Sequence, residues 1–282
     1  MTDSPSRKPA KESRGLEVEG VSVRYGGHLA LDTLSLTAPL GRITGLIGPN
    51  GAGKTTTFNA CTGLLRPTTG TVRLFGEDVT HAAPQVRAQR GLGRTFQRME
   101  LFDSLTVRAN VALGREAAMA GSKPWRHLVP ARGNRARVSE VTDQALELCD
   151  ITHLATRQAA ALSTGQRRLV ELARVIAGGF QVLLLDEPSS GLDRVETARF
   201  GEILEGLLEA RELGILLVEH DMSLVMKICG YIHVLDFGKP IFEGTAEQVR
   251  TSELVRAAYL GDESVETEVE AEEHSSSQTR AG

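Results

Sequence analysis

The segment with the clearest chemical meaning is a glycine-rich run that ends in a lysine and a threonine. It fits the phosphate-binding pattern G-x-x-x-x-G-K followed by serine or threonine. Its residues are Gly48, Pro49, Asn50, Gly51, Ala52, Gly53, Lys54 and Thr55, with Thr56 next. In this pattern backbone N–H groups surround phosphate oxygens, the lysine neutralises the outer phosphates and the hydroxyl faces Mg²⁺. The run therefore predicts a nucleotide site.

The elements expected on either side of this run support that prediction. Residues 41–47 form a short apolar segment typical of a strand, and residues 55–65 carry apolar side chains at helical spacing. A strand before the loop and a helix after it is the context that the motif requires. A chance match in a glycine-rich loop is therefore disfavoured.

Two adjacent carboxylates follow an apolar run later in the chain. Residues 182–185 are Val-Leu-Leu-Leu, typical of a buried parallel strand, and Asp186 and Glu187 come directly after them. Asp186 is suited to hold Mg²⁺ and Glu187 to polarise an attacking water, as phosphoryl transfer to water requires. Taken alone, an Asp-Glu pair after a strand is more often a helix N-cap, and this alternative stays open.

A second anion-binding element is indicated by Leu162-Ser163-Thr164-Gly165-Gln166, ahead of a helix expected over 167–176. Ser163 and the backbone of Gly165 would lie at the helix N-terminus, where partial positive charge favours anions. By itself such a segment is an ordinary N-cap. Because it is separate from the first loop, it suggests a composite site.

The rest of the pattern indicates a mixed α/β chain. Residues 16–36 predict two or three strands, 71–75 a further strand entered by a turn at 69–70, and 215–218 a buried strand separated from 182–185 by a helix. Residues of about 101–174 are helical in pattern, with a basic stretch at 124–137. That stretch is either a solvated loop or a contact with lipid headgroups or a partner.

Composition narrows the class of protein. The chain has 282 residues, a net charge of −4 and only 4% aromatic residues, which argues against a nucleic-acid partner. Cys61, Cys149 and Cys229 lack ligand spacing and are expected to be free thiols. No signal peptide and no membrane span are expected, and residues 1–14 and the acidic residues 262–282 are expected to be disordered tails.

Taken together, these motifs resemble the ATP-binding subunit of an ABC transporter over about 16–261, in the order of that family. The resemblance implies a P-loop NTPase core with a doubly wound, mostly parallel sheet, an antiparallel β subdomain and a helical subdomain inserted at about 99–175. It implies that Tyr25 stacks on adenine, that 48–55 are Walker A, and that Asp186 and Glu187 are Walker B and the catalytic glutamate. It gives four further assignments: Gln97 as the Q-loop residue that senses Mg²⁺, 162–166 as the signature, Asp193 as the D-loop and His220 as the switch histidine.

The family resemblance also implies partners and a mechanism. ATP, bound with Mg²⁺, would bridge two ATP-binding subunits, which are either identical or paralogous. Each subunit would contact the ATP of its partner through Ser163, Thr164, Gly165 and Gln166. Closure driven by ATP would be relayed to permease subunits at the cytoplasmic face of the inner membrane, and indirectly to a substrate-binding protein. The signature departs from the family's usual Ser-Gly-Gly-Gln at Thr164. If that position needs a positive φ or a close backbone approach, the threonine would weaken the signature.

Finer motifs favour one kind of transporter. Arg94-Thr95-Phe96-Gln97, Glu219-His220-Asp221-Met222 and the Ala-Tyr-Leu-Gly ending at 258–261 are similar to uptake ATPases for branched-chain amino acids. Urea or amide importers and lipopolysaccharide-export ATPases share part of this pattern and remain alternatives. A soluble ABC ATPase is disfavoured because the chain has one set of motifs and no heptad run. A regulatory module without turnover is disfavoured by Glu187 and His220.

Overall fold

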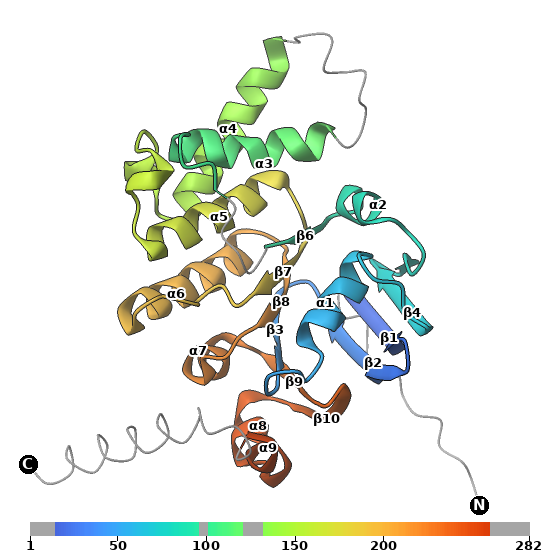
Figure 1. Ribbon diagram of the computed structural model, residues 1–282. Coiled ribbons are helices and arrows are strands. Elements are labelled where there is room, and N and C mark those ends of the chain that lie inside the picture. The colour runs from blue at the N-terminus through green and yellow to red at the C-terminus, as the bar shows by residue number, and fades with distance from the viewer. Residues whose placement is uncertain (1–14, 96–100, 121–131, 260–282) are drawn as a thin grey trace, which may run out of the picture.

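The computed structural model describes residues 15–95, 101–120 and 132–259, which form two sheets and a helical layer (Figure 1). A four-stranded antiparallel sheet has the order β2-β1-β4-β5. Its strands are β1 (Leu16–Tyr25), β2 (His28–Ala38), β4 (Thr69–Leu74) and β5 (Glu77–Asp78). The predicted two or three strands over 16–36 are therefore two, because β1 runs on through register shifts between Val18 and Arg24.

The central sheet has six strands in the order β10-β9-β3-β8-β7-β6, parallel except for β10. These strands are β3 (Arg42–Ile47), β6 (Leu92–Arg94), β7 (Val182–Asp186), β8 (Gly214–Val218), β9 (Tyr231–Asp236) and β10 (Lys239–Gly244). Every residue of β7 and β8 is buried, as the continuous apolar runs predicted.

Both faces of the central sheet are covered, which explains why β7 and β8 do not alternate in polarity. Leu183 and Leu185 of β7 belong to the core beneath the helices, whereas Val182 and Leu184 belong to the core shared with the antiparallel sheet and α1. Successive side chains of a strand point to opposite faces, so a strand packed on both sides must be apolar throughout.

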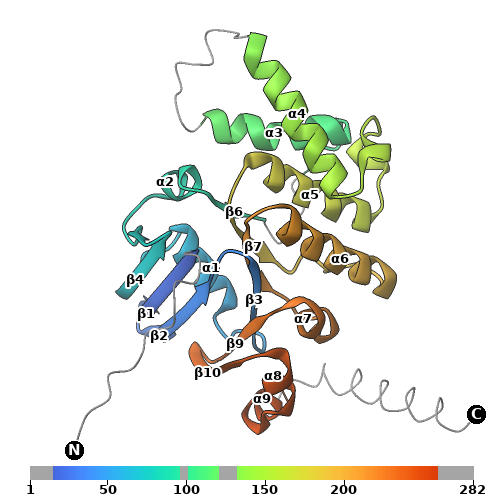
Figure 2. The same ribbon diagram turned by 180° about the vertical axis from the view of Figure 1, so that it is seen from behind.

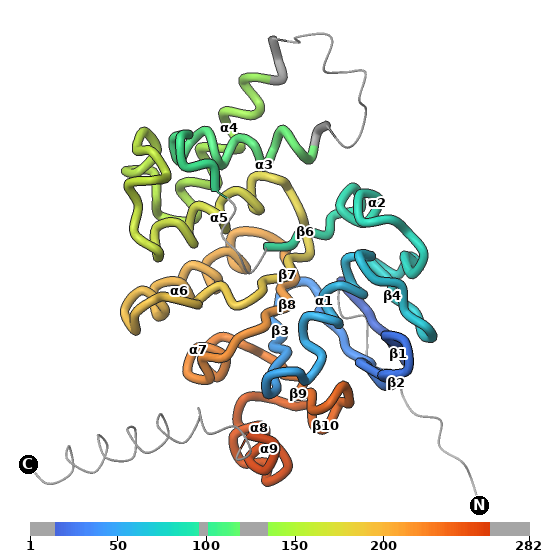
Figure 3. Tube along the Cα trace, viewed as in Figure 1, coloured from blue at the N-terminus to red at the C-terminus, as the bar shows by residue number. Residues whose placement is uncertain are grey.

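The helices occupy defined positions around this sheet. They are α1 (Lys54–Thr62), α2 (Pro84–Gln89), α3 (Val107–Ala120), α4 (Arg132–Leu148), α5 (Thr164–Gly178), α6 (Arg194–Ala210), α7 (Met222–Ile228), α8 (Ala246–Thr251) and α9 (Glu253–Tyr259), with short 3-10 turns at Thr152–Leu154 and Ala159–Ala161. Helices α3, α4 and α5 pack on one another at the end of the molecule opposite α8 and α9 (Figures 2 and 3). No helix in the described part of the chain is long and apolar enough to cross a membrane.

Several predicted boundaries were wrong. Helix α5 runs from Thr164 to Gly178 rather than over 167–176, so it includes most of the segment at 162–166. Helix α1 ends at Thr62 rather than Leu65, because Gly63 adopts a left-handed conformation with φ 80° and caps it. Strand β4 begins at Thr69, where a turn was expected, since Ser22 of β1 pairs with Thr69. Helix α4 begins at Arg132, inside the stretch read as a basic loop at 124–137. The predicted tails at 1–14 and 262–282 lie outside the described residues.

Candidate functional site

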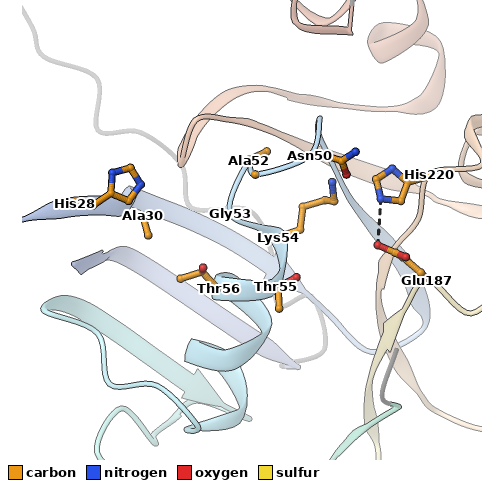
Figure 4. Close-up of a pocket in the computed structure, with 11 residues that line it drawn as sticks. His28, Ala30, Asn50, Ala52, Gly53, Lys54, Thr55, Thr56, Glu187 and His220 are labelled. Carbon is orange, nitrogen blue, oxygen red and sulfur yellow. Dashed lines mark hydrogen bonds and ion pairs between the residues drawn. The ribbon is translucent and has the colours of Figure 1, made fainter. Parts of the chain in front are cut away.

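The site forms where three neighbouring parallel strands end. The glycine-rich loop follows β3, the Asp186-Glu187 pair closes β7, and Glu219-His220 follow β8, which lies between the other two strands. Because parallel strands end at one edge of a sheet, the three segments converge there. They line a cavity of about 290 Å³, shown in Figure 4. Its lining residues are His28, Ala30, Asn50, Gly51, Ala52, Gly53, Lys54, Thr55, Thr56, Glu187 and His220.

The conformation of the loop requires glycine at both ends. Gly48 has φ 152°, and a Cβ there would lie 2.1 Å from the carbonyl oxygen of Leu235. Gly53 has φ 101°, and a Cβ there would lie 2.7 Å from Leu31 Cδ2. Left-handed backbone and close packing are both tolerated only by glycine. The loop is thus held tightly between the two sheets, and its backbone faces the cavity.

Positive charge is concentrated at the end of this loop. Helix α1 starts at Lys54, and its N-cap Gly53 provides no side-chain hydrogen bond to the first turn. The N–H groups of that turn are therefore available to an anion. Lys54 is 7% exposed, and its ammonium group donates to the carbonyls of Gly48 and Pro49, which holds it beside the cavity. Thr55 and Thr56 add hydroxyls to the lining. This arrangement suits a chain of phosphates.

Glu187 and His220 lie side by side in the lining of the cavity. His220 Nε2 lies 3.1 Å from Glu187 Oε1 (Figure 4). Glu187 has φ 47°, which is unusual for a residue with a side chain, and its N–H donates to the carbonyl of Val218 at 2.9 Å. Backbone strain of this kind persists only where the surroundings impose it, and it concentrates at functional sites.

Asp186 lies deeper, at 3% exposure, and pairs with an arginine. Arg94 Nη2 donates to Asp186 Oδ2 at 2.9 Å, and Arg94 Nη1 donates to Asn59 Oδ1 of α1 at 2.7 Å. Neither Asp186 nor Glu187 caps a helix, because the N-cap of α6 is Asp193. The helix-cap alternative for this carboxylate pair was therefore wrong.

The signature segment, residues 162–166, lies at the start of α5. Ser163 is its N-cap, and Ser163 and Gln166 form a capping box. Thr164 opens the helix and is not among the described residues with a positive φ, so the backbone strain considered for it does not arise. A Cβ at Gly165 would lie 2.5 Å from Glu196 Oε1, and Glu196 completes the capping box of Asp193. The signature segment and the start of α6 therefore touch.

The predicted site residues thus fall into two groups. The loop residues Asn50–Thr56, Glu187 and His220 share the cavity, and the predicted residues Gly48, Pro49 and Asp186 adjoin them in the sequence without lining it. The second group consists of Ser163, Thr164, Gly165, Gln166 and Asp193, which are all described by the structure and do not line the cavity. Tyr25 is 49% exposed at the end of β1 and lies outside the lining, although its cross-strand neighbour His28 is part of it. Gln97 lies outside the described residues.

Sequence reasoning missed four contributors. His28 and Ala30 line the cavity, and a Tyr-Gly-Gly-His hairpin that brings His28 opposite Tyr25 was the available signal. Arg94 was considered only as a subfamily marker, although it pairs with Asp186. Glu219 was considered only as part of a motif, although its carboxylate bonds two loops of the site. No sequence pattern alone indicated these last two contacts.

Comparisons with known proteins agree with this geometry. Residues 31–190 match the family model described as ABC transporter, and residues 239–265 match one described as branched-chain amino acid ATP-binding cassette transporter. The chain is 37% identical over 258 residues to the high-affinity branched-chain amino acid transport ATP-binding protein BraF of Pseudomonas aeruginosa, covering 88% of this chain and 98% of the relative. It is 35% identical over 248 residues to the lipopolysaccharide export system ATP-binding protein LptB of Haemophilus influenzae, with the same coverage.

A solved structure supports the same conclusion. The ADP conformation of MJ1267, an ATP-binding cassette of an ABC transporter, superposes with a TM-score of 0.77 at 28% identity, covering 88% of this chain and 99% of that one. The expected fold class, a P-loop core with an antiparallel β part and a helical part, is therefore confirmed. On these motifs, this fold and these relatives, the chain belongs to the ATP-binding subunits of ABC transporters and is an ATPase.

Proposed function

We propose that the cavity binds the triphosphate of ATP with Mg²⁺ and hydrolyses it, and that this reaction powers uptake of branched-chain or other hydrophobic amino acids. The observation that carries the proposal is the convergence of the Lys54 loop, Glu187 and His220 on one cavity at the ends of β3, β7 and β8. Phosphoryl transfer needs positioning and charge neutralisation above all, and these three elements provide both.

Lys54 and the loop backbone would hold the phosphates. The donors suited to Mg²⁺ are oxygen atoms, namely the hydroxyl of Thr55, the carboxylate of Asp186 and the amide oxygen of Gln97. Mg²⁺ prefers such ligands together with waters and substrate phosphates. Bound there, the ion would neutralise charge on the β- and γ-phosphates. Arg94 holds the Oδ2 atom of Asp186 at 2.9 Å and also donates to Asn59 of α1, so the carboxylate of Asp186 is fixed relative to the helix that follows the loop.

Hydrolysis would then be performed by the paired side chains. Glu187 would accept a hydrogen bond from a water whose oxygen attacks the γ-phosphorus, while the bond from that phosphorus to the β–γ bridging oxygen breaks and ADP leaves. His220, 3.1 Å from Glu187, would orient Glu187 and contact the γ-phosphate. The adenine would lie toward Tyr25 and His28 at the hairpin of β1 and β2.

The second group of residues would act on a second ATP-binding subunit. Ser163, Thr164, Gly165 and Gln166 lie at a helix N-terminus outside this chain's cavity, where they are suited to meet the γ-phosphate of ATP bound by that subunit. Asp193 would contribute at the same contact. ATP would then favour the closed pair by its higher affinity for that state, and hydrolysis would release it.

The transported substrate is inferred from relatives. The identity to BraF and the match at 239–265 favour branched-chain amino acids, while the likeness to LptB keeps lipopolysaccharide export as the second candidate. In either system the chain would bind permease subunits at the cytoplasmic face of the cell membrane and would contact no substrate itself. A substrate-binding protein would take part only in import.

The test is reconstitution of the chain in vesicles with the membrane subunits and binding protein of a branched-chain amino acid importer. Vesicles that enclose ATP on the side of the ATPase should take up labelled leucine or valine only with the intact chain, and Glu187→Gln should abolish uptake. ATPase activity that responds to lipopolysaccharide but not to amino acids would instead favour export. Turnover that responds to neither would contradict both transport assignments while leaving the ATPase assignment standing.

A further inference from the structure

One buried carboxylate of the site has no role in the mechanism above. Glu219 is 3% exposed and lies between Val218, the last residue of β8, and His220. Its Oε1 accepts a hydrogen bond from the backbone N–H of Ser189 at 2.7 Å, and its Oε2 accepts one from the backbone N–H of His220 at 3.1 Å. One carboxylate therefore receives hydrogen bonds from two separate loops.

These contacts offset part of the cost of burying the Glu219 carboxyl group, whose pKa is raised on balance. Burial raises the pKa of Glu219, and the hydrogen bonds from Ser189, His220 and Asp221 act in the opposite direction by stabilising the carboxylate. A buried polar group is costly unless its hydrogen bonds are made, so a glutamate with this set of donors is held in one place. The Glu219 side chain therefore forms a fixed bridge between the backbone of Ser189 and the backbone of His220.

The two bridged loops carry the two reacting side chains. Ser189 is two residues after Glu187, and Ser190 N–H donates to the carbonyl of Glu187 at 3.1 Å, so this turn is closed on itself. His220 directly follows Glu219. Glu187 and His220 meet at 3.1 Å, and Glu187 is kept at a strained φ of 47°. The Glu219 carboxylate links the backbones on both sides of that contact.

We propose that Glu219 is a positioning residue for ATP hydrolysis: by bridging the backbones of Ser189 and His220 it fixes the distance and orientation of Glu187 relative to His220. Glu219 does not line the cavity, in contrast to Glu187 and His220 on either side of it. Its effect is therefore on the chemical step and not on nucleotide binding. Misplacing a reacting group by an ångström can cost about 100-fold in rate, and a loss of about 10- to 100-fold in kcat is expected here.

The test compares Glu219→Gln with Glu171→Gln in the full chain. Glutamine keeps the size but replaces one oxygen by an N–H₂ group that faces a backbone N–H, so one arm of the bridge is lost. Glu171 is the matched control: it is 4% exposed, pairs with Arg168 on α5 and lies outside the cavity lining.

Amide hydrogen exchange should accelerate at 187–191 and 219–221 in Glu219→Gln and stay unchanged there in Glu171→Gln. Equal protection of both loops in Glu219→Gln would refute the bridge without any need for turnover.

Single-turnover hydrolysis provides the second readout. Glu219→Gln should lower the rate of hydrolysis by 10- to 100-fold and leave ATP affinity unchanged within about twofold. In a His220→Ala background the same substitution should lower the rate less than about threefold, because the effects of residues that act as a unit are not additive. If Glu219→Gln lowers the rate of hydrolysis equally in the wild-type and His220→Ala backgrounds, or lowers ATP affinity as well, its role is a general structural one. If Glu219→Gln does not fold, Glu219→Asp, which keeps the charge but is too short to reach both loops, takes its place with the same expectations.

Discussion

The loop at 48–55 and the signature segment at 162–166 both place a helix N-terminus where an anion could bind, but they are built in opposite ways. Helix α1 begins after a left-handed Gly53 with no side-chain cap, so its first N–H groups face the cavity unblocked. Helix α5 begins with a complete capping box between Ser163 and Gln166. The first element is open to the cavity, whereas the hydrogen bonds of the second are already made by its own side chains.

This contrast indicates which element binds nucleotide without help. An uncapped helix start beside Lys54 gains hydrogen bonds when a phosphate enters, so it can bind ATP in the isolated chain. A helix start whose cap is already made gains less, and it needs a second subunit to bring the phosphate to it. The four predictions below test this difference, beginning with the largest expected effect.

Glu187→Gln should lower the rate of hydrolysis by about 100- to 10,000-fold, because the group that orients the attacking water is lost. ATP affinity should stay within about threefold, since Lys54 and the loop backbone still hold the phosphates. Single-turnover hydrolysis and equilibrium binding on the same preparations measure the two effects. Glu205→Gln on α6 is the matched control and should behave as wild type. Substantial turnover in Glu187→Gln would show that Glu187 is not the group that orients the attacking water.

Lys54→Ala should weaken ATP binding by the isolated chain about 10- to 100-fold, as expected for one lost charge-assisted contact. Ser163→Ala is the comparison from the other region and should leave that affinity unchanged, while costing about 1 kcal/mol of stability through the lost cap. Isothermal titration with Mg–ATP and thermal unfolding separate these effects. Comparable losses of affinity in the two variants would mean that the signature segment binds nucleotide within one chain, contrary to the comparison above.

Tyr25→Ala should weaken ATP binding by about 1–3 kcal/mol if the ring stacks on adenine. His28→Ala tests the neighbouring residue, which lines the cavity where Tyr25 does not. Titration with ATP and with inorganic triphosphate distinguishes the base from the phosphates, because only ATP affinity should fall. If ATP affinity falls in His28→Ala but not in Tyr25→Ala, the residue that contacts adenine is His28 and not Tyr25.

Most of the residues that line the cavity could be predicted because they belong to short contiguous segments of the sequence. The loop needs its glycines locally, and β7 and β8 are apolar throughout because both of their faces are covered. What could not be predicted depends on groups distant in sequence. The buried guanidinium of Arg87 donates to the carbonyls of Ala60 and Cys61 near the end of α1, and Arg94 reaches Asp186 across the sheet. No local periodicity encodes such contacts.

The signature segment provides the smallest expected effect, and it bears on why Thr164 is tolerated. Thr164 is the first residue of α5, and its Cγ2 lies 3.2 Å from where a Cβ on Gly191 would be, so its methyl group fills space beside the start of α6. Thr164→Gly removes that methyl group and adds chain entropy, and it should cost about 0.5 kcal/mol of stability. ATP affinity of the isolated chain and hydrolysis in the assembled complex should both be unchanged, because no positive φ is needed there. Faster hydrolysis in the glycine variant would show instead that the threonine hinders approach of the partner's phosphate. The capped signature segment would then limit the rate of hydrolysis at the open loop of the partner subunit.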